Sequence, residues 1–269
     1  MTHLRSGKIA LITGASSGIG EALALEFARR GIHVALVGRR IDALESVAAR
    51  VRELGAGALV LPGDVADRDF AESAVQKTIE AFGALDLLVL SAGISMWARF
   101  DEVKELDLFE RIMKVNYLGA VYFTYFALPY LRTRGGDIVA ISSHTGITGV
   151  PTRTGYAASK HALQGFFDSL RVELRETPMN ILVVSPGFVD TPIRENILGG
   201  DGQKAGYQGR ATEAPMPLEE AIRQILEAIE GRKRELVMTG RARFGRFLRL
   251  IAPALVDRIA AKAVGDPGR

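Results

Sequence analysis

Short apolar runs alternate along the chain with longer segments in which apolar residues recur at helical spacing. The short runs hold few polar side chains, which is typical of strands buried on both faces of a parallel sheet. They predict strands over Ile9–Thr13, His33–Val37, Ala58–Leu61, Leu85–Leu90, Asp137–Ser142, Ile181–Ser185 and Leu236–Thr239. Helices are predicted from the first glycine-rich turn to about Arg30 and over Ile41–Leu54, Arg68–Phe82, Leu106–Leu131, Gly155–Glu176 and Glu219–Glu230. This alternation predicts one α/β domain, a doubly wound parallel sheet with helices on both faces.

Two segments interrupt the alternation. Asp190–Pro217 contains three prolines and several glycines, and so long a connection in a compact domain is usually functional. We expect it to be the substrate loop or lid of a catalytic domain covering residues 1–240. Residues 241–269 are predicted to form a separate C-terminal tail.

The tail has the pattern of a basic amphipathic helix. Its apolar residues are spaced 3, 1, 3, 4 and 4 apart and share one helical face: Phe244, Phe247, Leu248, Ile251, Leu255 and Ile259. Four arginines cluster at its start: Arg241, Arg243, Arg246 and Arg249. Pro253 predicts a kink or break. Two interpretations stay open: the tail lies in a membrane interface, or it packs over the substrate cleft or against another subunit.

Composition narrows the classes of function. The 269 residues include no cysteine, which excludes disulfides, thiolate catalysis and Cys-bound metal, and we expect no metal in the site. The sequence has no signal-peptide pattern and no membrane-spanning run, so a cytoplasmic protein is predicted, peripheral at a membrane if the tail docks there. The net charge of +3 comes from residues 232–269, where ten basic residues meet three acidic ones. This argues against nucleic-acid binding by the domain as a whole.

The first predicted strand runs into a glycine-rich turn that opens a helix. Glycines let the backbone turn tightly and approach a pyrophosphate, and the helix N-terminus offers unpaired N–H groups to the anion. The spacing G-x-x-x-G-x-G differs from the commonest dinucleotide fingerprint. Its place at the first strand–helix junction nevertheless predicts a dinucleotide site formed by Gly14, Ser16, Ser17, Gly18, Ile19 and Gly20.

The end of the second predicted strand distinguishes NAD(H) from NADP(H). An acidic residue there would bind the ribose 2′-hydroxyl, whereas this strand ends in Val37-Gly38-Arg39-Arg40. Arginine binds a 2′-phosphate through its charge and its bidentate fork, so we predict NADP(H) held by Arg39 and Arg40. Asp64 either borders the adenine or caps the next helix. Ser91-Ala92-Gly93 leaves room for the cofactor to pass, or serves packing alone.

Tyr156 and Lys160 are four residues apart in a predicted helix and therefore share one face. Tyrosine titrates near pKa ~10, and a nearby ammonium group favours the phenolate. Ser143 ends the fifth strand and is placed to donate a hydrogen bond to a substrate oxygen. Together these groups can exchange a proton with a carbonyl or alcohol while a hydride moves to or from nicotinamide. His144 is interpreted as a wall or structural residue.

With these motifs the chain up to about Gly240 resembles the short-chain dehydrogenase/reductase family. The residues that carry the resemblance are Thr13, Gly14, Gly18, Gly20, Asp64, Val65, Ala92, Gly93, Val115, Asn116, Ser143, Tyr156, Lys160, Pro186, Gly187 and Thr191. The resemblance implies a Rossmann-type sheet of seven parallel strands. The family's usual Asn-Asn-Ala-Gly is Leu90-Ser91-Ala92-Gly93 here, a departure that affects strand-supporting hydrogen bonds more than catalysis.

The resemblance also implies roles for four residues. Tyr156 is the general acid/base, and Ser143 orients and polarises the substrate oxygen. Lys160 lowers the pKa of Tyr156 and binds the nicotinamide ribose, and Asn116 holds a water that relays protons. Val65 joins the cofactor-binding residues, and four more border the nicotinamide: Pro186, Gly187, Val189 and Thr191.

Within the family, the segment Tyr156–Phe167 is similar to the corticosteroid 11-oxo reductase branch. The resemblance implies an NADP(H)-dependent oxidoreductase for a bulky apolar ketone or secondary alcohol. It implies a homodimer or homotetramer paired through the helices at Leu106–Leu131 and Gly155–Glu176. Two alternatives stay open: a sugar-nucleotide epimerase or dehydratase, and a non-catalytic protein that senses NADP(H) or docks on a membrane. Substrate selection is expected from Ser95–Phe100, His144–Thr154 and Asp190–Pro217.

Overall fold

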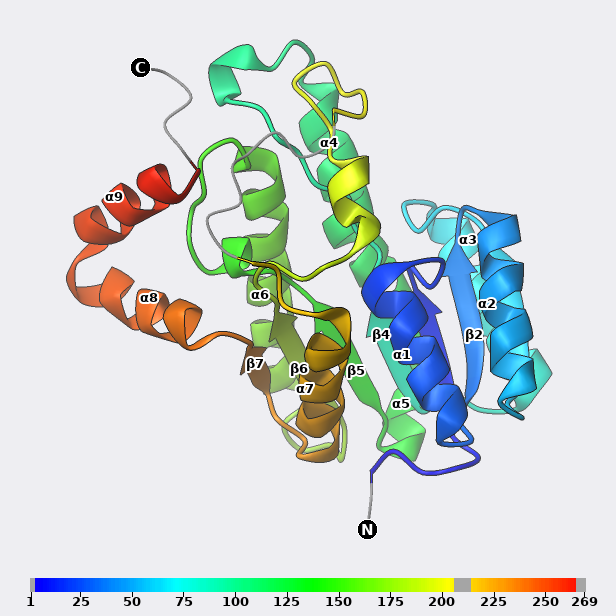
Figure 1. Cartoon of the computed structure of the whole chain (residues 1–269). Coiled ribbons are helices and arrows are strands. Elements are labelled where there is room, and N and C mark those ends of the chain that lie inside the picture. The colour runs from blue at the N-terminus through cyan, green and yellow to red at the C-terminus, as the bar shows by residue number, and fades with distance from the viewer. Residues whose placement is uncertain (1–2, 206–213, 265–269) are drawn as a thin grey trace.

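The seven predicted strands form one parallel sheet in the order β3-β2-β1-β4-β5-β6-β7 (Figure 1). The computed structural model describes residues 3–205 and 214–264. The strands are β1 (Ile9–Thr13), β2 (His33–Gly38), β3 (Ala58–Pro62), β4 (Leu87–Leu90), β5 (Asp137–Ile141), β6 (Asn180–Ser185) and β7 (Glu235–Val237). The sheet confirms the predicted fold class. Because the strand order reverses between β1 and β4, a crevice opens at their carboxyl ends.

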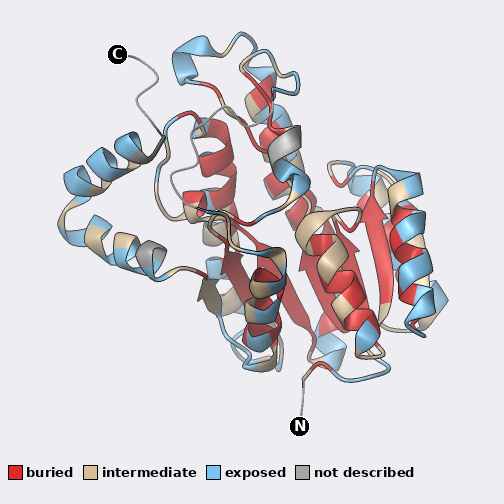
Figure 2. Ribbon diagram, viewed as in Figure 1, coloured by how far each residue is buried: buried red, intermediate tan, exposed pale blue. Residues whose placement is uncertain are grey.

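Helices cover both faces of the sheet. One face packs against α1 (Gly18–Arg29), α2 (Ile41–Glu53) and α7 (Leu218–Glu230). The other packs against α3 (Arg68–Phe82), α5 (Gly119–Arg134) and α6 (Thr154–Glu173). Successive side chains of β1 alternate between the two cores, since Ala10 and Ile12 face the first helix set and Leu11 the second. The central strands β1, β4 and β5 are therefore buried throughout, whereas β3 and β7 at the two edges of the sheet are mostly half-buried (Figure 2).

The helix predicted over Leu106–Leu131 is interrupted. It consists of α4 (Asp107–Met113), a single π-helical turn η2 (Lys114–Leu118) and α5. Turns of this kind inside α-helices are frequent at functional sites. This one carries Asn116, whose side chain is buried. A one-residue change of helical register is not visible in an apolar pattern, so the sequence predicted a continuous helix.

The connection after β6 folds back over the carboxyl edge of the sheet. It contains the short helix η4 (Pro192–Asn196), and Leu198 then pairs with Met96 and with Lys204. Met216 returns to pair with Val189. Residues 206–213 of the predicted lid lie outside the described part. After β7 the chain forms α8 (Gly240–Ile251) and α9 (Pro253–Val264), and the predicted break occurs at Pro253.

The hydroxyl of Thr13 joins the carboxyl ends of β1 and β4. It accepts hydrogen bonds from the backbone N–H groups of Ser91 (3.1 Å) and Ala92 (3.2 Å), and it donates one to the Val89 carbonyl (3.4 Å). Thr13 is buried. This hydroxyl holds the strand end at the point where the sequence lacks two side-chain amides.

Replacing Thr13 by Val should lower the free energy of unfolding by about 2 kcal/mol, since two half-buried N–H groups lose their acceptor, each at the low end of about 1–3 kcal/mol. Urea unfolding followed by circular dichroism measures the change. Thr13→Ser keeps the hydroxyl and is the matched control. Equal losses in the two variants would show that the methyl group, not the hydrogen bonds, supports this strand end.

Candidate active site

A cavity of about 930 Å³ opens at the carboxyl ends of the strands, between the segments that follow β1, β2, β4, β5 and β6. Its size is in the upper range of small-molecule sites. All the residues predicted for the cofactor and for catalysis line it, with the exception of Gly20 and Asn116. The crevice is therefore one continuous site, with the glycine turn at one end and Tyr156 at the other.

The glycine turn packs so closely that side chains would not fit. A Cβ atom on Gly14 would lie 2.8 Å from the backbone nitrogen of Ala92, and Gly14 and Gly18 both adopt positive φ angles. A Cβ on Gly20 would lie 2.4 Å from the Gly14 carbonyl oxygen. Gly20 thus supports the turn from the side away from the cavity, while Ser16, Ser17 and Ile19 face the cavity. The turn leaves the amino end of α1 open toward the cavity, as an anion requires.

The end of β2 contributes two cations, Arg39 and Arg40, to the described lining of the cavity, and this strand end contributes no carboxylate to it. The Arg40 guanidinium donates hydrogen bonds to the Ser16 carbonyl (3.1 Å) and hydroxyl (3.2 Å), which hold it against the glycine turn. Arg39 lines the same end of the cavity. Asp64 also lines it and accepts a hydrogen bond from the Ala66 N–H, whereas Asp67 caps α3. The alternative reading of Asp64 as the helix cap is therefore wrong.

Asn116 lies behind the cavity wall and ties two elements together. Its Oδ1 accepts a hydrogen bond from the Ile94 N–H (2.8 Å), and its Nδ2 donates to the Ile94 carbonyl (2.9 Å) and the Ser159 hydroxyl (2.9 Å). Both amide hydrogens are thus engaged with protein groups. The side chain fixes the segment after β4 against α6, and the relay water that the family resemblance implies for Asn116 stays a prediction.

Tyr156 and Lys160 lie on the buried side of α6, and Ser143 follows the end of β5. Ser143 Oγ accepts a hydrogen bond from the Thr145 N–H (3.2 Å), which leaves the hydroxyl proton for another acceptor. Lys160 Nζ donates to the Ile141 carbonyl (2.8 Å) and lies 5.7 Å from the centre of the Tyr156 ring. The three side chains converge on one point of the cavity wall.

Burial dominates the protonation of this group. It raises the pKa of Tyr156, against the lowering effects of the Ser143 hydrogen bond and of the Arg153 charge. It also lowers the pKa of Lys160 to about 8. That Lys160 lowers the pKa of Tyr156 stays a prediction, because a Lys160 with a pKa of about 8 is still mostly protonated at neutral pH. At Tyr156 the charge that opposes the effect of burial is that of Arg153.

His144 is a wall residue, in agreement with its interpretation from the sequence. Burial lowers the pKa of His144 to about 4, so the imidazole is neutral at physiological pH. Its backbone N–H donates to the Pro186 carbonyl (2.9 Å), and a Cβ atom on Gly187 would lie 2.8 Å from its ring. Pro186 and Gly187, with Val189 and Thr191, form the adjoining wall of the cavity.

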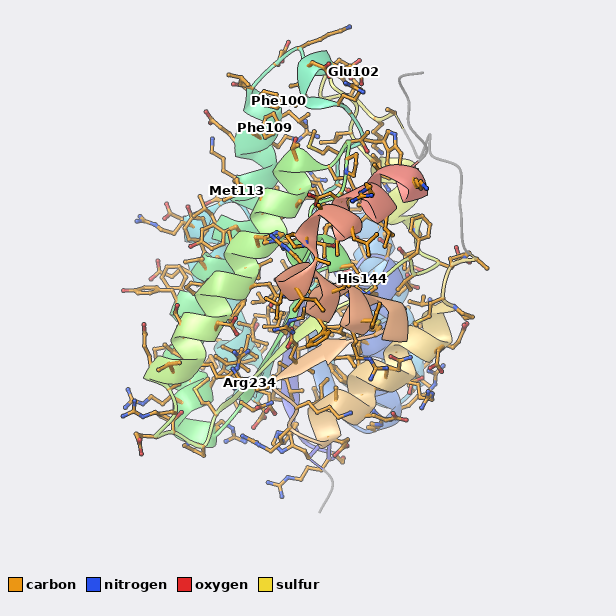
Figure 3. All side chains as sticks on the ribbon, turned by 90° about the vertical axis from the view of Figure 1, so that its left-hand side faces the viewer. Phe100, Glu102, Phe109, Met113, His144 and Arg234 are labelled. Carbon is orange, nitrogen blue, oxygen red and sulfur yellow. The ribbon has the colours of Figure 1, made fainter. Side chains whose placement is uncertain are left out.

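The substrate end of the cavity contains residues to which the sequence gave no individual role, most of them within the segments expected to select the substrate. The Arg153 guanidinium lies 4.9 Å above the Trp97 ring and 5.9 Å from the Tyr156 ring, and it donates to the Ser95 hydroxyl (3.0 Å). Arg111 and Lys204 also line this end. Near it, Phe100 and Phe109 stack edge to face (Figure 3). The position of Arg153, three residues before Tyr156 and so on the same side of the helix, is the signal that would have identified it.

Comparison with known proteins shows which proteins this chain resembles. The sequence profile described as short chain dehydrogenase matches residues 8–201. An 11-beta-hydroxysteroid dehydrogenase-like 2 of Arabidopsis thaliana is 44% identical over 69% of this chain and 60% of its own length. The chain therefore spans about three fifths of that relative. A dehydrogenase/reductase SDR family protein 7-like of Anopheles gambiae is 39% identical over 97% of this chain and 84% of its own length.

Solved structures share the fold. A short chain dehydrogenase/reductase from Burkholderia phymatum, in complex with NAD, superposes with a TM-score of 0.84 at 23% identity, over 95% of this chain and 96% of that one. An alcohol dehydrogenase from the archaeon Thermococcus sibiricus, complexed with 5-hydroxy-NADP, gives a TM-score of 0.72 at 27% identity, over 85% and 93%. The two differ in the cofactor present.

Replacing Arg153 by Gln should raise the pKa of Tyr156, because the cation that favours the phenolate is removed. Oxidation of an alcohol needs the phenolate, so the rising limb of its pH–rate profile should move to higher pH. Arg153→Lys keeps a positive charge and should restore part of the shift. An unchanged limb in the Gln variant would leave Arg153 with a packing role only.

Proposed function

This chain belongs to the short-chain dehydrogenase/reductase family, and we propose that it is an NADP(H)-dependent oxidoreductase that interconverts a ketone or aldehyde and the corresponding alcohol. The observation that carries the proposal is the convergence of Ser143, Tyr156 and Lys160 on a cavity that continues to the glycine turn. A proton-transferring group and a dinucleotide site thus share one cleft.

Three side chains of the cavity have separate roles in the reaction. In the reductive direction Tyr156, kept protonated by burial, gives its phenolic proton to the oxygen that develops negative charge. Ser143, oriented by the Thr145 N–H, donates a second hydrogen bond to that oxygen. Lys160, anchored by the Ile141 carbonyl, holds the ribose next to nicotinamide. A bound NADPH supplies the hydride.

The residues present fit NADP(H). The closely packed glycine turn leaves room for backbone and not for side chains. Ser16 holds Arg40 over the turn, and Arg39 lines the same end of the cavity. The two cations suit a 2′-phosphate, which carries two negative charges. The amino end of α2 begins immediately after Arg40 and adds favourable partial charge. These features support NADP(H) over NAD(H), between which the related structures do not decide.

A bulky apolar ketone or secondary alcohol is the substrate class we propose. Beside the cations Arg111, Arg153 and Lys204, the substrate end has large apolar side chains: Trp97, Val150, Phe188, Ile193, Ile197 and Leu198. The names of the 11-beta-hydroxysteroid dehydrogenase-like relatives agree with such a substrate. Reduction is the direction we propose, because the NADPH supply of cells favours it.

The same proposal extends to the organisation of the chain. Residues 1–240 act as the catalytic unit, with 190–217 as the substrate loop and 241–269 as a tail. We propose a homodimer or homotetramer paired through α4–α5 and α6. Tyr125 on α5 and Val172 on α6 support this, since they are large apolar side chains left exposed on those helices.

Purified protein should oxidise NADPH in the presence of carbonyl compounds, with faster turnover of long-chain ketones and keto-steroids than of small aldehydes. Tyr156→Phe should lower kcat by about 10²–10⁴-fold, because the general acid is lost, while NADPH affinity stays unchanged. Turnover of small carbonyls alone would contradict the substrate class. Undiminished output in the Phe variant would favour a non-catalytic cofactor sensor.

Replacing Arg39 and Arg40 together by Ala should raise the Kd for NADPH by about tenfold to a hundredfold, as expected for the loss of hydrogen bonds to a charged group. The Kd for NADH, which lacks the 2′-phosphate, should change little. Fluorescence titration measures both, with Arg175→Ala, an exposed arginine at the end of α6, as control. Equal changes for the two nucleotides would remove the basis for NADP(H) preference.

A further inference from the structure

Helices α8 and α9 present large apolar side chains to solvent. No described residue of the two helices is buried (Figure 2). Phe244, Phe247 and Ile251 are 63%, 59% and 67% exposed, and their spacing of three and four places them on one face of α8. Leu255 and Ile259 are also exposed on α9. Nearly half of the large apolar residues exposed in the described part lie here, which exceeds the scattered exposure of an ordinary surface.

The orientation of α8 explains this exposure. Arg246 forms an ion pair with Glu235 of β7, and Arg249 donates a hydrogen bond to the Ile147 carbonyl. These two contacts hold α8 against the body of the protein, while Phe244, Phe247 and Ile251 stay exposed and Leu248 of the same face is half-buried. A surface helix ordinarily buries its apolar stripe. Such an arrangement leaves an apolar face without a partner within the described chain.

The charges that remain exposed are mostly positive. Arg243, Arg258 and Lys262 are exposed on α8 and α9, and Asp257 is the acidic residue among the described part of these helices. An apolar face flanked by basic residues is the composition of helices that lie in a lipid interface. Anionic headgroups attract each Lys or Arg that comes close to them.

We propose that the exposed face of α8 and α9, formed by Phe244, Phe247, Ile251, Leu255 and Ile259, docks on an anionic phospholipid bilayer. The contact is peripheral, because no helix in the described ranges is long and apolar enough to cross a membrane. A second copy of the chain fits less well. A twofold contact places each patch against itself, and Arg243, Arg258 and Lys262 would then oppose the same cations.

The docking face adjoins the rim of the cavity. Arg249 is bonded to Ile147, and His144, Thr145 and Val150 of the same segment line the cavity. Docking of the protein therefore places this rim of the cavity near the bilayer. If the proposed function is right, an apolar ketone dissolved in the lipid reaches Tyr156 without crossing water; the docking itself does not rest on that function.

Sedimentation with vesicles tests the docking. The protein should bind vesicles of phosphatidylcholine mixed with phosphatidylserine, bind pure phosphatidylcholine vesicles weakly, and lose affinity as salt is raised. Phe244→Asp with Phe247→Asp should lower the affinity about tenfold or more, since two apolar anchors are lost. Arg243→Glu should lower it at low salt. Leu54→Asp, at a side chain 41% exposed just after the end of α2, is the matched control.

NADPH affinity and circular dichroism of the variants should equal those of the unmodified protein, because these side chains do not line the cavity. That readout separates a failure of docking from a failure of the fold or of the proposed function. Equal binding to the two kinds of vesicle, or equal binding by the Phe variant and its control, would overturn the proposal. So would a protein that binds no vesicle and changes from dimer to monomer in the Phe variant, because a second copy would then cover this face.

Discussion

All seven strands run in the same direction, so their carboxyl ends meet at one edge of the sheet. The strand order reverses between β1 and β4, and the segments that follow them diverge to opposite faces. The cavity exists because of this divergence. The glycine turn after β1, the cations after β2 and the serine after β5 all face it for the same reason. Thr13 and Asn116 then fix the segment after β4 across the opening, through bonds to backbone at Ser91, Ala92 and Ile94.

Burial sets the electrostatics inside this cavity. It disfavours the charged form of Tyr156, Lys160 and His144 alike, raising the pKa of the first and lowering those of the others. Tyr156 is thereby kept as an acid, which suits proton donation to a carbonyl oxygen. Stabilisation of its phenolate depends on neighbours that remain charged. Arg153 is one such neighbour, because its guanidinium lies over Trp97 and near Tyr156 at the cavity wall.

The C-terminal helices differ from the other helices in leaving most of their large apolar side chains exposed. In α1, α2, α3, α5, α6 and α7 apolar side chains face the sheet, and their burial stabilises the fold. In α8 the contacts with the body include those of Arg246 and Arg249, while Phe244, Phe247 and Ile251 stay exposed. Apolar area therefore stays exposed on a protein whose core is otherwise complete. The proposed contact with an anionic lipid surface would cover these apolar side chains and pair the exposed cations with negative charge.

The sequence alone determined the sheet, because buried parallel strands leave uninterrupted apolar runs and each helix leaves a periodic pattern. It also predicted many of the residues that line the cavity, with Gly20 and Asn116 as exceptions, since glycine turns and strand ends map directly onto the carboxyl edge. Three features needed the tertiary structure: the π turn that carries Asn116, the place of Arg153 above Tyr156, and the outward apolar face of α8. Each depends on contacts between segments far apart in the chain. An amphipathic pattern shows that a helix has two faces, but only packing decides which of them is covered.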